Sequence, residues 1–225
     1  MTIIELKNVN YQVGKRTILN NLSFGIKNGD FLTLIGPSGA GKSTILKLIA
    51  NLISPSSGTI FYHGSDIQKL DPIKYRRQVM YCFQQPVLFG KTVKDNLSFP
   101  YQIRNKEVDL ARLDSLLKIV DLPAEFLNKE INSLSGGEKQ RVALIRSIVF
   151  LPKVLLLDEV TAGLDGKSKE IVHRLIESVH RQGTTIVQVT HDQSEIQVAK
   201  NVLEIKSRGL VNEKSRGLVN EKCNG

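Results

Sequence analysis

Two short motifs in different halves of the chain have the residue types and spacing of phosphate-binding sites. Residues 36–44 read GPSGAGKST, and residues 134–141 read LSGGEKQR. The first meets the pattern G-x-x-x-x-G-K-[ST], in which successive backbone N–H groups turn inward around phosphate oxygens. Side chains would block that approach, which explains the repeated glycine. The first motif therefore predicts a nucleotide-binding loop.

The surroundings of this loop fit the same function. An apolar run at Asp30–Ile35 precedes it and predicts a buried strand, and apolar residues follow it at helical spacing. A helix that begins under the phosphates directs its positive end at the anion. Lys42 is expected to contact the β- and γ-phosphates, and the Ser43 hydroxyl to ligate Mg²⁺. The predicted ATP contacts are Gly36, Pro37, Ser38, Gly39, Ala40, Gly41, Lys42, Ser43 and Thr44.

Two carboxylates end a second apolar run, at Val154–Glu159. Four consecutive apolar residues are typical of a strand buried on both faces of a parallel sheet, and ligands bind at the carboxyl ends of such strands. Acids also follow strands simply because strand ends are solvated. Beside a phosphate loop we favour function, with Asp158 holding Mg²⁺ and Glu159 orienting the attacking water.

A third β-rich run, Thr184–Thr190, is followed by His191. A histidine at that strand end could touch the γ-phosphate, although a lone histidine is more often structural. The LSGGE segment likewise has a plain interpretation, because Ser135 and Glu138 have the spacing of a helix capping box. Two glycines weaken a first helical turn, however, and they favour close approach of a phosphate to the N-terminal amides.

With these motifs the chain resembles the ATP-binding subunits of ABC transporters, from Met1 to about Val211. The resemblance implies that Ser135, Gly136 and Gly137 of one subunit cap the γ-phosphate held by another. By the same resemblance, Tyr11 stacks on adenine, Gln84 contacts Mg²⁺ and the water, Asp165 crosses the dimer interface and His191 is the switch histidine. For Tyr11 the alternative is packing within a sheet. Val160 departs from the family, which usually has proline after the catalytic glutamate.

The resemblance also implies partners. ATP drives two copies together, and the segment from Gln84 to Lys94, with Gln85–Phe89 as its mixed apolar part, docks an integral membrane permease. Core packing is the alternative for that stretch. Segments at residues 51–58, 81–90 and 96–105 are similar to the bacterial iron-export type. They suggest iron export, with small-solute import or a soluble ABC-type ATPase acting on nucleic acid or ribosomes as alternatives. Glu159 and His191 argue against a regulatory binder without hydrolysis.

Composition limits these functions. The 225 residues include 31 Lys or Arg and 22 Asp or Glu, for a formal net charge of +9. The cations are scattered, which favours solvation over a nucleic-acid surface. No apolar run approaches the ~20 residues of a membrane helix, so transport requires a separate membrane subunit, with this chain at the cytoplasmic face. Neither a signal peptide nor metal-ligand spacing of histidine and cysteine is evident, which leaves ATP and Mg²⁺ as the expected cofactors.

We predict an α/β fold: a P-loop NTPase core with a mainly parallel sheet, an N-terminal antiparallel β subdomain and an α-helical signature subdomain. The expected units are 1–91 with 151–211 for the core and 92–150 for the helical subdomain, where Leu110, Leu113, Leu117 and Val120 share one face. Residues 212–225 form a repeated tail, since Ser207–Lys214 recurs as Ser215–Lys222. The first copy is expected to complete a hairpin through Gly209.

Overall fold

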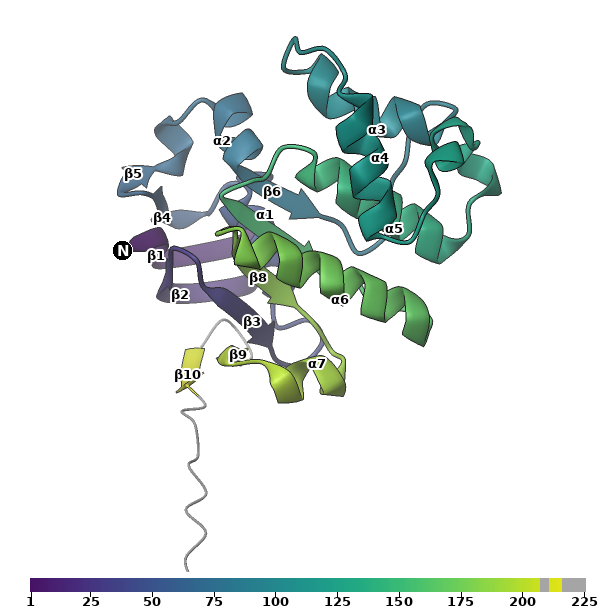
Figure 1. The fold of residues 1–225 in the computed structure, drawn as a ribbon. Coiled ribbons are helices and arrows are strands. Elements are labelled where there is room, and N and C mark those ends of the chain that lie inside the picture. The colour runs from purple at the N-terminus through teal and green to yellow at the C-terminus, as the bar shows by residue number, and fades with distance from the viewer. Residues whose placement is uncertain (207–210, 216–225) are drawn as a thin grey trace, which may run out of the picture.

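Two β-sheets and a group of helices that extends to one side make up the chain (Figure 1). The computed structural model describes residues 1–206 and the backbone of residues 211–215. The strands are β1 (Thr2–Val13), β2 (Arg16–Lys27), β3 (Phe31–Ile35), β4 (Ser57–Tyr62), β5 (Ser65–Asp66), β6 (Val79–Cys82), β7 (Val154–Asp158), β8 (Thr185–Val189), β9 (Asn201–Ile205) and β10 (Val211–Ser215). The helices are α1 (Lys42–Ile49), α2 (Pro72–Gln78), α3 (Val93–Gln102), α4 (Leu110–Ile119), α5 (Gly136–Ile148), α6 (Gly166–Arg181) and α7 (Gln193–Val198), with 3₁₀ turns η1 (Ile67–Lys69), η2 (Ala124–Asn128) and η3 (Ile131–Ser133).

The smaller sheet is antiparallel, with strand order β2-β1-β4-β5. Alternating side chains produce it: Leu22, Phe24 and Ile26 of β2 all point into the core. The expected N-terminal antiparallel subdomain is therefore present, and β4 extends it near residues 60–63 as predicted.

The larger sheet has the order β10-β9-β3-β8-β7-β6, and all its described pairings except β10 with β9 are parallel. Every residue of β7 is buried. Val154 and Leu156 belong to a core that includes α1 and the small sheet, whereas Leu155 and Leu157 belong to a core that includes α5 and α6. Burial on both faces explains why this strand reads as a continuous apolar run. The mainly parallel core predicted from the sequence is confirmed.

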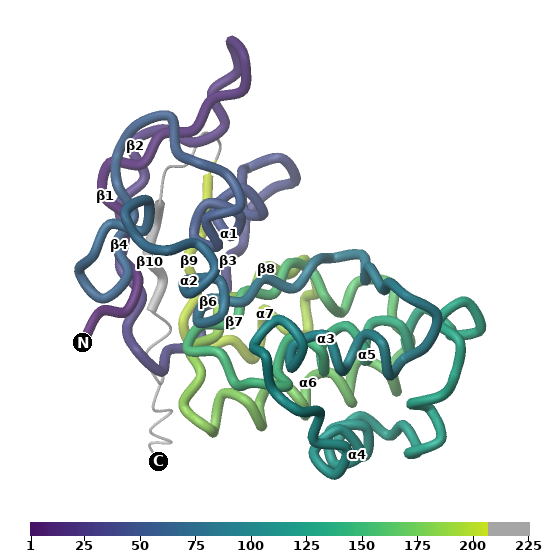
Figure 2. The backbone as a smooth tube through the Cα atoms, turned by 90° about the horizontal axis from the view of Figure 1, so that it is seen from above, coloured from purple at the N-terminus to yellow at the C-terminus, as the bar shows by residue number. Residues whose placement is uncertain are grey.

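Helices α3, α4 and α5 lie together at one side of the molecule, away from the small sheet, in both views (Figures 1 and 2). Leu113, Leu117 and Val120 are buried there, as predicted. Leu110, at the first position of α4, is 50% exposed, so this end of the predicted apolar face is not part of the buried core. The core of this part continues onto one face of the large sheet.

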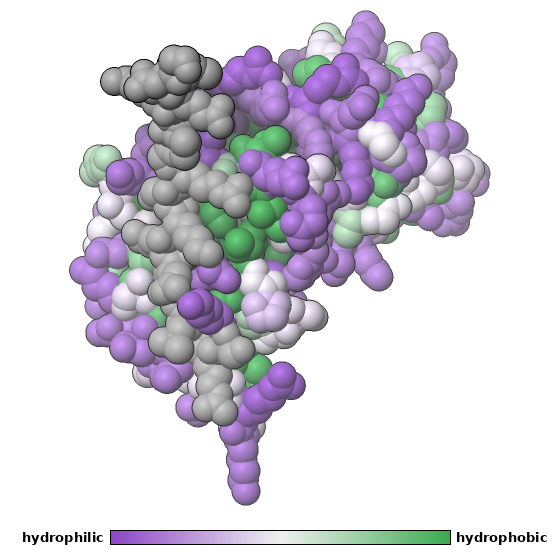
Figure 3. Space-filling model, turned by 90° about the horizontal axis from the view of Figure 1, so that it is seen from below, coloured by the Kyte–Doolittle hydropathy of each residue, from purple (hydrophilic) through white to green (hydrophobic). Residues whose placement is uncertain are grey.

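The C-terminal hairpin expected from the first repeat copy is present in the backbone, since β10 pairs antiparallel with β9 and continues to Ser215. Gly209 and residues 216–222 of the second copy lie outside the described residues. Hydrophilic residues cover most of the face seen in Figure 3, with apolar residues gathered near its middle. Within the described residues, no helix is long and apolar enough to cross a membrane.

Candidate active site

The phosphate loop joins β3 to α1 and has a backbone that only glycine tolerates well. Gly36, Gly39 and Gly41 have φ values of 144°, 77° and 94°, in the region that L side chains rarely adopt. A Cβ on Gly36 would lie 2.1 Å from the Ile205 carbonyl oxygen, and one on Gly41 would lie 2.7 Å from Cδ2 of Leu19. Packing against backbone, as well as conformation, therefore requires glycine at position 36, whereas at position 41 the side chain of Leu19 would have to shift.

Lys42, the first residue of α1, is almost completely buried. Its Nζ donates to the carbonyl oxygens of Gly36 and Pro37, both at 2.9 Å. Burial lowers the pKa of Lys42, and the nearby carboxylates of Glu159 and Asp158 act in the opposite direction. The loop thus holds a cation at its centre, where phosphate oxygens would compete with the two carbonyls for it.

Asp158 ends β7 beside the start of α1. Its Oδ1 accepts a hydrogen bond from Ser43 Oγ at 2.7 Å, and its Oδ2 accepts one from the Tyr81 hydroxyl at 2.5 Å. The carboxylate is 6% exposed. Ser43 and Asp158 together present the hard oxygen ligands that Mg²⁺ prefers. Sequence reasoning missed Tyr81, whose signal was its place on strand β6, shortly before Gln84.

Glu159 receives partners from two other loops. Its Oε2 accepts a hydrogen bond from Gln84 Nε2 at 2.9 Å, and its Oε1 lies 3.2 Å from His191 Nε2. The residue has a positive φ of 50°, and its backbone N–H donates to Val189 O at 3.0 Å. The structure thus brings together Glu159 and Gln84, which were predicted to contact the attacking water, and His191, which was predicted to contact the γ-phosphate.

The loop after Glu159 is firmly held although it has Val160 where the family usually has proline. Val160 is buried in the core that includes α5 and α6. Ala162 N donates to Glu159 O at 3.0 Å, and Leu164 N donates to Thr161 O at 3.2 Å. The packing of Val160 and these local hydrogen bonds restrict the backbone of the loop, as a proline at this position would.

The second motif forms the expected helix cap. Ser135 Oγ accepts from Glu138 N at 3.3 Å, and Glu138 Oε2 accepts from Ser135 N at 2.7 Å. A Cβ on Gly137 would lie 2.7 Å from Ser168 Oγ, whereas one on Gly136 would meet open space. Asp165 caps α6 by accepting from Ser168 N at 2.9 Å. Ser168 thus joins the predicted interface residue Asp165 to the LSGGE helix.

A recess of about 660 Å³ lies between the phosphate loop and the β1–β2 hairpin. Its walls include Pro37–Ala40 on one side and Lys15 and Arg16 on the other. Tyr11 is not among its lining residues and is partly buried against the core that includes α1. In the structure, Tyr11 thus packs against this core, which is the alternative to adenine stacking. Sequence reasoning missed Lys15 and Arg16, whose signal was two adjacent cations at a hairpin turn.

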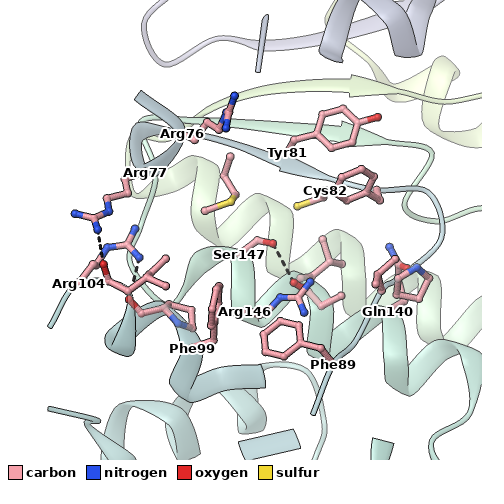
Figure 4. Close-up of a pocket in the computed structure, with 18 of the residues that line it drawn as sticks. Arg76, Arg77, Tyr81, Cys82, Phe89, Phe99, Arg104, Gln140, Arg146 and Ser147 are labelled. Carbon is pink, nitrogen blue, oxygen red and sulfur yellow. Dashed lines mark hydrogen bonds between the residues drawn. The ribbon is translucent and has the colours of Figure 1, made fainter. Parts of the chain in front are cut away.

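A separate groove of about 800 Å³ lies between α2 and β6 on one side and α3 and α5 on the other (Figure 4). Its apolar part includes Phe83, Val87, Phe89 and Phe99, all of them exposed. Its basic part consists of Arg76, Arg77, Arg104 and Arg146. Within the described residues, none of these four arginines forms an ion pair. Burial and the neighbouring Arg77 lower the pKa of Arg104.

The sequence profile of the ABC transporter family matches residues 19–162, which is more than half of the chain. The chain belongs to the ABC transporter family. It is similar to the probable iron export ATP-binding protein FetA of Escherichia coli K12, at 49% identity over 205 residues that cover 91% of each protein. This ABC protein therefore binds and hydrolyses ATP, as predicted from its two motifs.

Import proteins are also among its relatives. The Fe(3+) ions import ATP-binding protein FbpC of Pasteurella multocida is 38% identical over 92% of this chain and 59% of its own length. The spermidine/putrescine import ATP-binding protein PotA of Clostridioides difficile is 37% identical over 94% of this chain and 61% of its own length. The chain thus spans about 60% of the length of these import relatives.

Solved structures confirm the fold. A dimeric ATP-binding cassette in a post-hydrolysis state with ADP and Pi has a TM-score of 0.85 and 30% identity, covering 96% of this chain and all of that one. A bacterial Atm1-family ABC exporter with ATP bound also has a TM-score of 0.85 and 30% identity, covering 95% of this chain and 38% of that one.

Proposed function

We propose that this ABC ATPase powers the export of iron through a separate membrane subunit. The observation that carries the proposal is the 49% identity, over 91% of both proteins, to a probable iron export ATP-binding protein. The two import relatives described above are 37–38% identical. This chain does not itself select the cargo, because the ion passes through the membrane subunit.

In the proposed reaction, Glu159 orients and polarises the attacking water. Gln84 and His191 hold its carboxylate from two sides, at 2.9 Å and 3.2 Å. Lys42 and the phosphate-loop amides bind the β- and γ-phosphates, and Ser43, Asp158 and Gln84 would hold Mg²⁺, which neutralises charge on the transferred phosphoryl group. Positioning and electrostatic stabilisation supply most of the rate enhancement in this type of reaction.

Two copies pair on ATP, with Ser135, Gly136 and Gly137 of one copy facing the phosphate loop of the other. The open space around Gly136 supports this arrangement, because no described residue outside its own helix lies within 4 Å of a Cβ placed there. Such an interface is isologous and holds two ATP molecules. Asp165 lies beside the motif through Ser168 and thus at the same interface. Tyr11 stays a proposed adenine contact, and Lys15 and Arg16 are added as phosphate-side contacts.

The membrane subunit docks in the groove between α2 and α3, which places the chain at the cytoplasmic face of the membrane. The four arginines there make hydrogen bonds to uncharged acceptors, such as Arg76 to Asn51 O at 2.7 Å and Arg146 to Asn96 Oδ1 at 2.9 Å. A short apolar segment that carries carboxylates complements this surface. Phe89 belongs to the docking surface, whereas Leu88 packs partly buried against the helical core.

Phe89→Asp should therefore leave the ATPase activity of the purified chain intact and abolish its stimulation by the membrane subunit. Leu88→Asp is the contrasting variant, because it should destabilise the fold. Equal stimulation of Phe89→Asp and wild type in proteoliposomes would rule out docking at this groove.

The cargo is tested in cells. Deletion of the gene should raise total iron and sensitivity to peroxide, and wild type should rescue both, whereas Lys42→Ala should not. A deletion strain with normal iron and reduced uptake of spermidine or another small solute would overturn iron export and favour import.

A further inference from the structure

A buried carboxylate lies outside the nucleotide motifs. Glu195, in α7, is 7% exposed. One of its oxygens, Oε1, accepts a hydrogen bond from Thr161 Oγ1 at 2.7 Å and lies 2.8 Å from His173 Nε2. A charge buried to this extent is costly unless it is paired and hydrogen-bonded. Glu195 thus needs both partners.

The partners of Glu195 come from different elements. Thr161 follows Glu159 by two residues, in the loop that leads to Asp165 and α6. Glu195 follows His191 by four residues, after the end of β8. The 2.7 Å hydrogen bond therefore connects the loop that carries the catalytic glutamate with helix α7, which directly follows the loop that carries the switch histidine.

Helix α6 anchors this connection at two points. His173 reaches Glu195, and Lys169, one turn earlier, reaches Asp192 with its Nζ at 2.6 Å from Oδ2. Both acids belong to the segment that follows His191. Burial alone would raise the pKa of Glu195, but hydrogen bonds from His173, Thr190 and Thr161 outweigh it, and the pKa lies below its usual value. The carboxylate is thus ionised and fixed at neutral pH.

We propose that Glu195 is a positioning residue that holds the Glu159 loop in register with the His191 loop. Glu159 Oε1 and His191 Nε2 are 3.2 Å apart, and Glu195 hydrogen-bonds to neither of these side chains within the described residues; its effect passes through Thr161 and the start of α7. A small misplacement of catalytic groups is expensive, since about 1 Å can cost on the order of 10²-fold in rate. This inference rests on ATP hydrolysis and is independent of the cargo.

The decisive variants are at Thr161, because they leave the carboxylate in place. Thr161→Val removes the donor at almost constant volume, and Thr161→Ser keeps the hydroxyl. We expect Thr161→Val to lower kcat about tenfold, which is less than the loss expected for a misplacement of about 1 Å. The KM and the Kd of a fluorescent ATP analogue should change little. Thr161→Ser should retain turnover close to wild type. Glu177→Gln, on the exposed face of α6, is the matched control.

A double-mutant comparison separates positioning from stability. Glu195→Leu should lower kcat, and adding Thr161→Val should cause little further loss, because each change removes the same hydrogen bond between Thr161 and Glu195. If Glu195→Leu does not fold, the comparison of Thr161→Val with Thr161→Ser still tests the proposal. Normal kcat in Thr161→Val, with only a lower Tm, would overturn the proposal and leave a purely structural role. Equal losses in Thr161→Val and Thr161→Ser would also overturn it.

Discussion

Glu159→Gln removes the negative charge from the centre of the proposed site while keeping its shape. In the wild type, one carboxylate oxygen accepts from Gln84 at 2.9 Å and the other lies 3.2 Å from His191. The amide has a single acceptor, so its –NH₂ group faces either a donor or the water that must be polarised. Loss of one such preorganised group costs about 10²–10³-fold in kcat, or about 2.7–4 kcal/mol.

ATP binding should survive this substitution. The phosphate loop and Lys42 make their contacts independently of the Glu159 side chain. Removal of a carboxylate from the vicinity of the phosphates also lowers repulsion, so the Kd for ATP should be unchanged or smaller. The variant should then accumulate as an ATP-bound dimer, because hydrolysis no longer separates the two copies.

Phosphate release at saturating Mg-ATP measures the loss of kcat, and a fluorescent ATP analogue measures the Kd for ATP. A sizing column with and without ATP shows whether the ATP-bound dimer accumulates. Glu170→Gln, exposed on α6, is the control for charge alone. Turnover near wild type in Glu159→Gln would refute the assignment of the catalytic carboxylate. A loss of ATP binding in this variant would instead refute the inference that Glu159 acts in hydrolysis without being needed for ATP binding.

Three further perturbations test other parts of the site. Gly41→Ala should abolish ATP binding in the same fluorescence assay, because its Cβ would lie 2.7 Å from Leu19 Cδ2 at a φ of 94°. Ser135→Trp should prevent the ATP-dependent dimer on a sizing column and cost about 1 kcal/mol of stability through the lost helix cap; a persisting dimer would leave the motif with a capping role only. The Glu195–His173 pair should stabilise the fold most between about pH 4.5 and 6.5. The hydrogen bond between His173 and Glu195 raises the pKa of His173 above 6.5. The stability that protonated His173 contributes is therefore lost as the pH rises through its pKa in the folded protein. The pKa of Glu195 is lowered from 4.5, so its contribution is lost as pH falls through the folded value. The Tm difference between wild type and His173→Leu should accordingly shrink at high pH, and a constant difference would contradict the pairing.

Local patterns predicted the elements well, because their signals are short-range. Strands β3 and β7 read as apolar runs and β8 as a β-rich run in the sequence. The phosphate loop was recognisable for the same reason, since its glycines and lysine are contiguous. Leu110 shows the limit of this reasoning, because helical periodicity does not show which end of an apolar face is exposed to solvent.

Short motifs are enough to predict the chemistry of this protein: a phosphate loop, two acids at one strand end and a histidine at another. Which of these side chains meet depends on the tertiary structure. The parallel strands β6, β7 and β8 lie side by side and bring Gln84, Glu159 and His191 within hydrogen-bonding reach of one another. The same fold places the Tyr81 hydroxyl on Asp158 and the Thr161 hydroxyl on Glu195. These contacts join residues 32 to 77 positions apart in the chain. No local pattern encodes them, because they depend on the order and register of the strands.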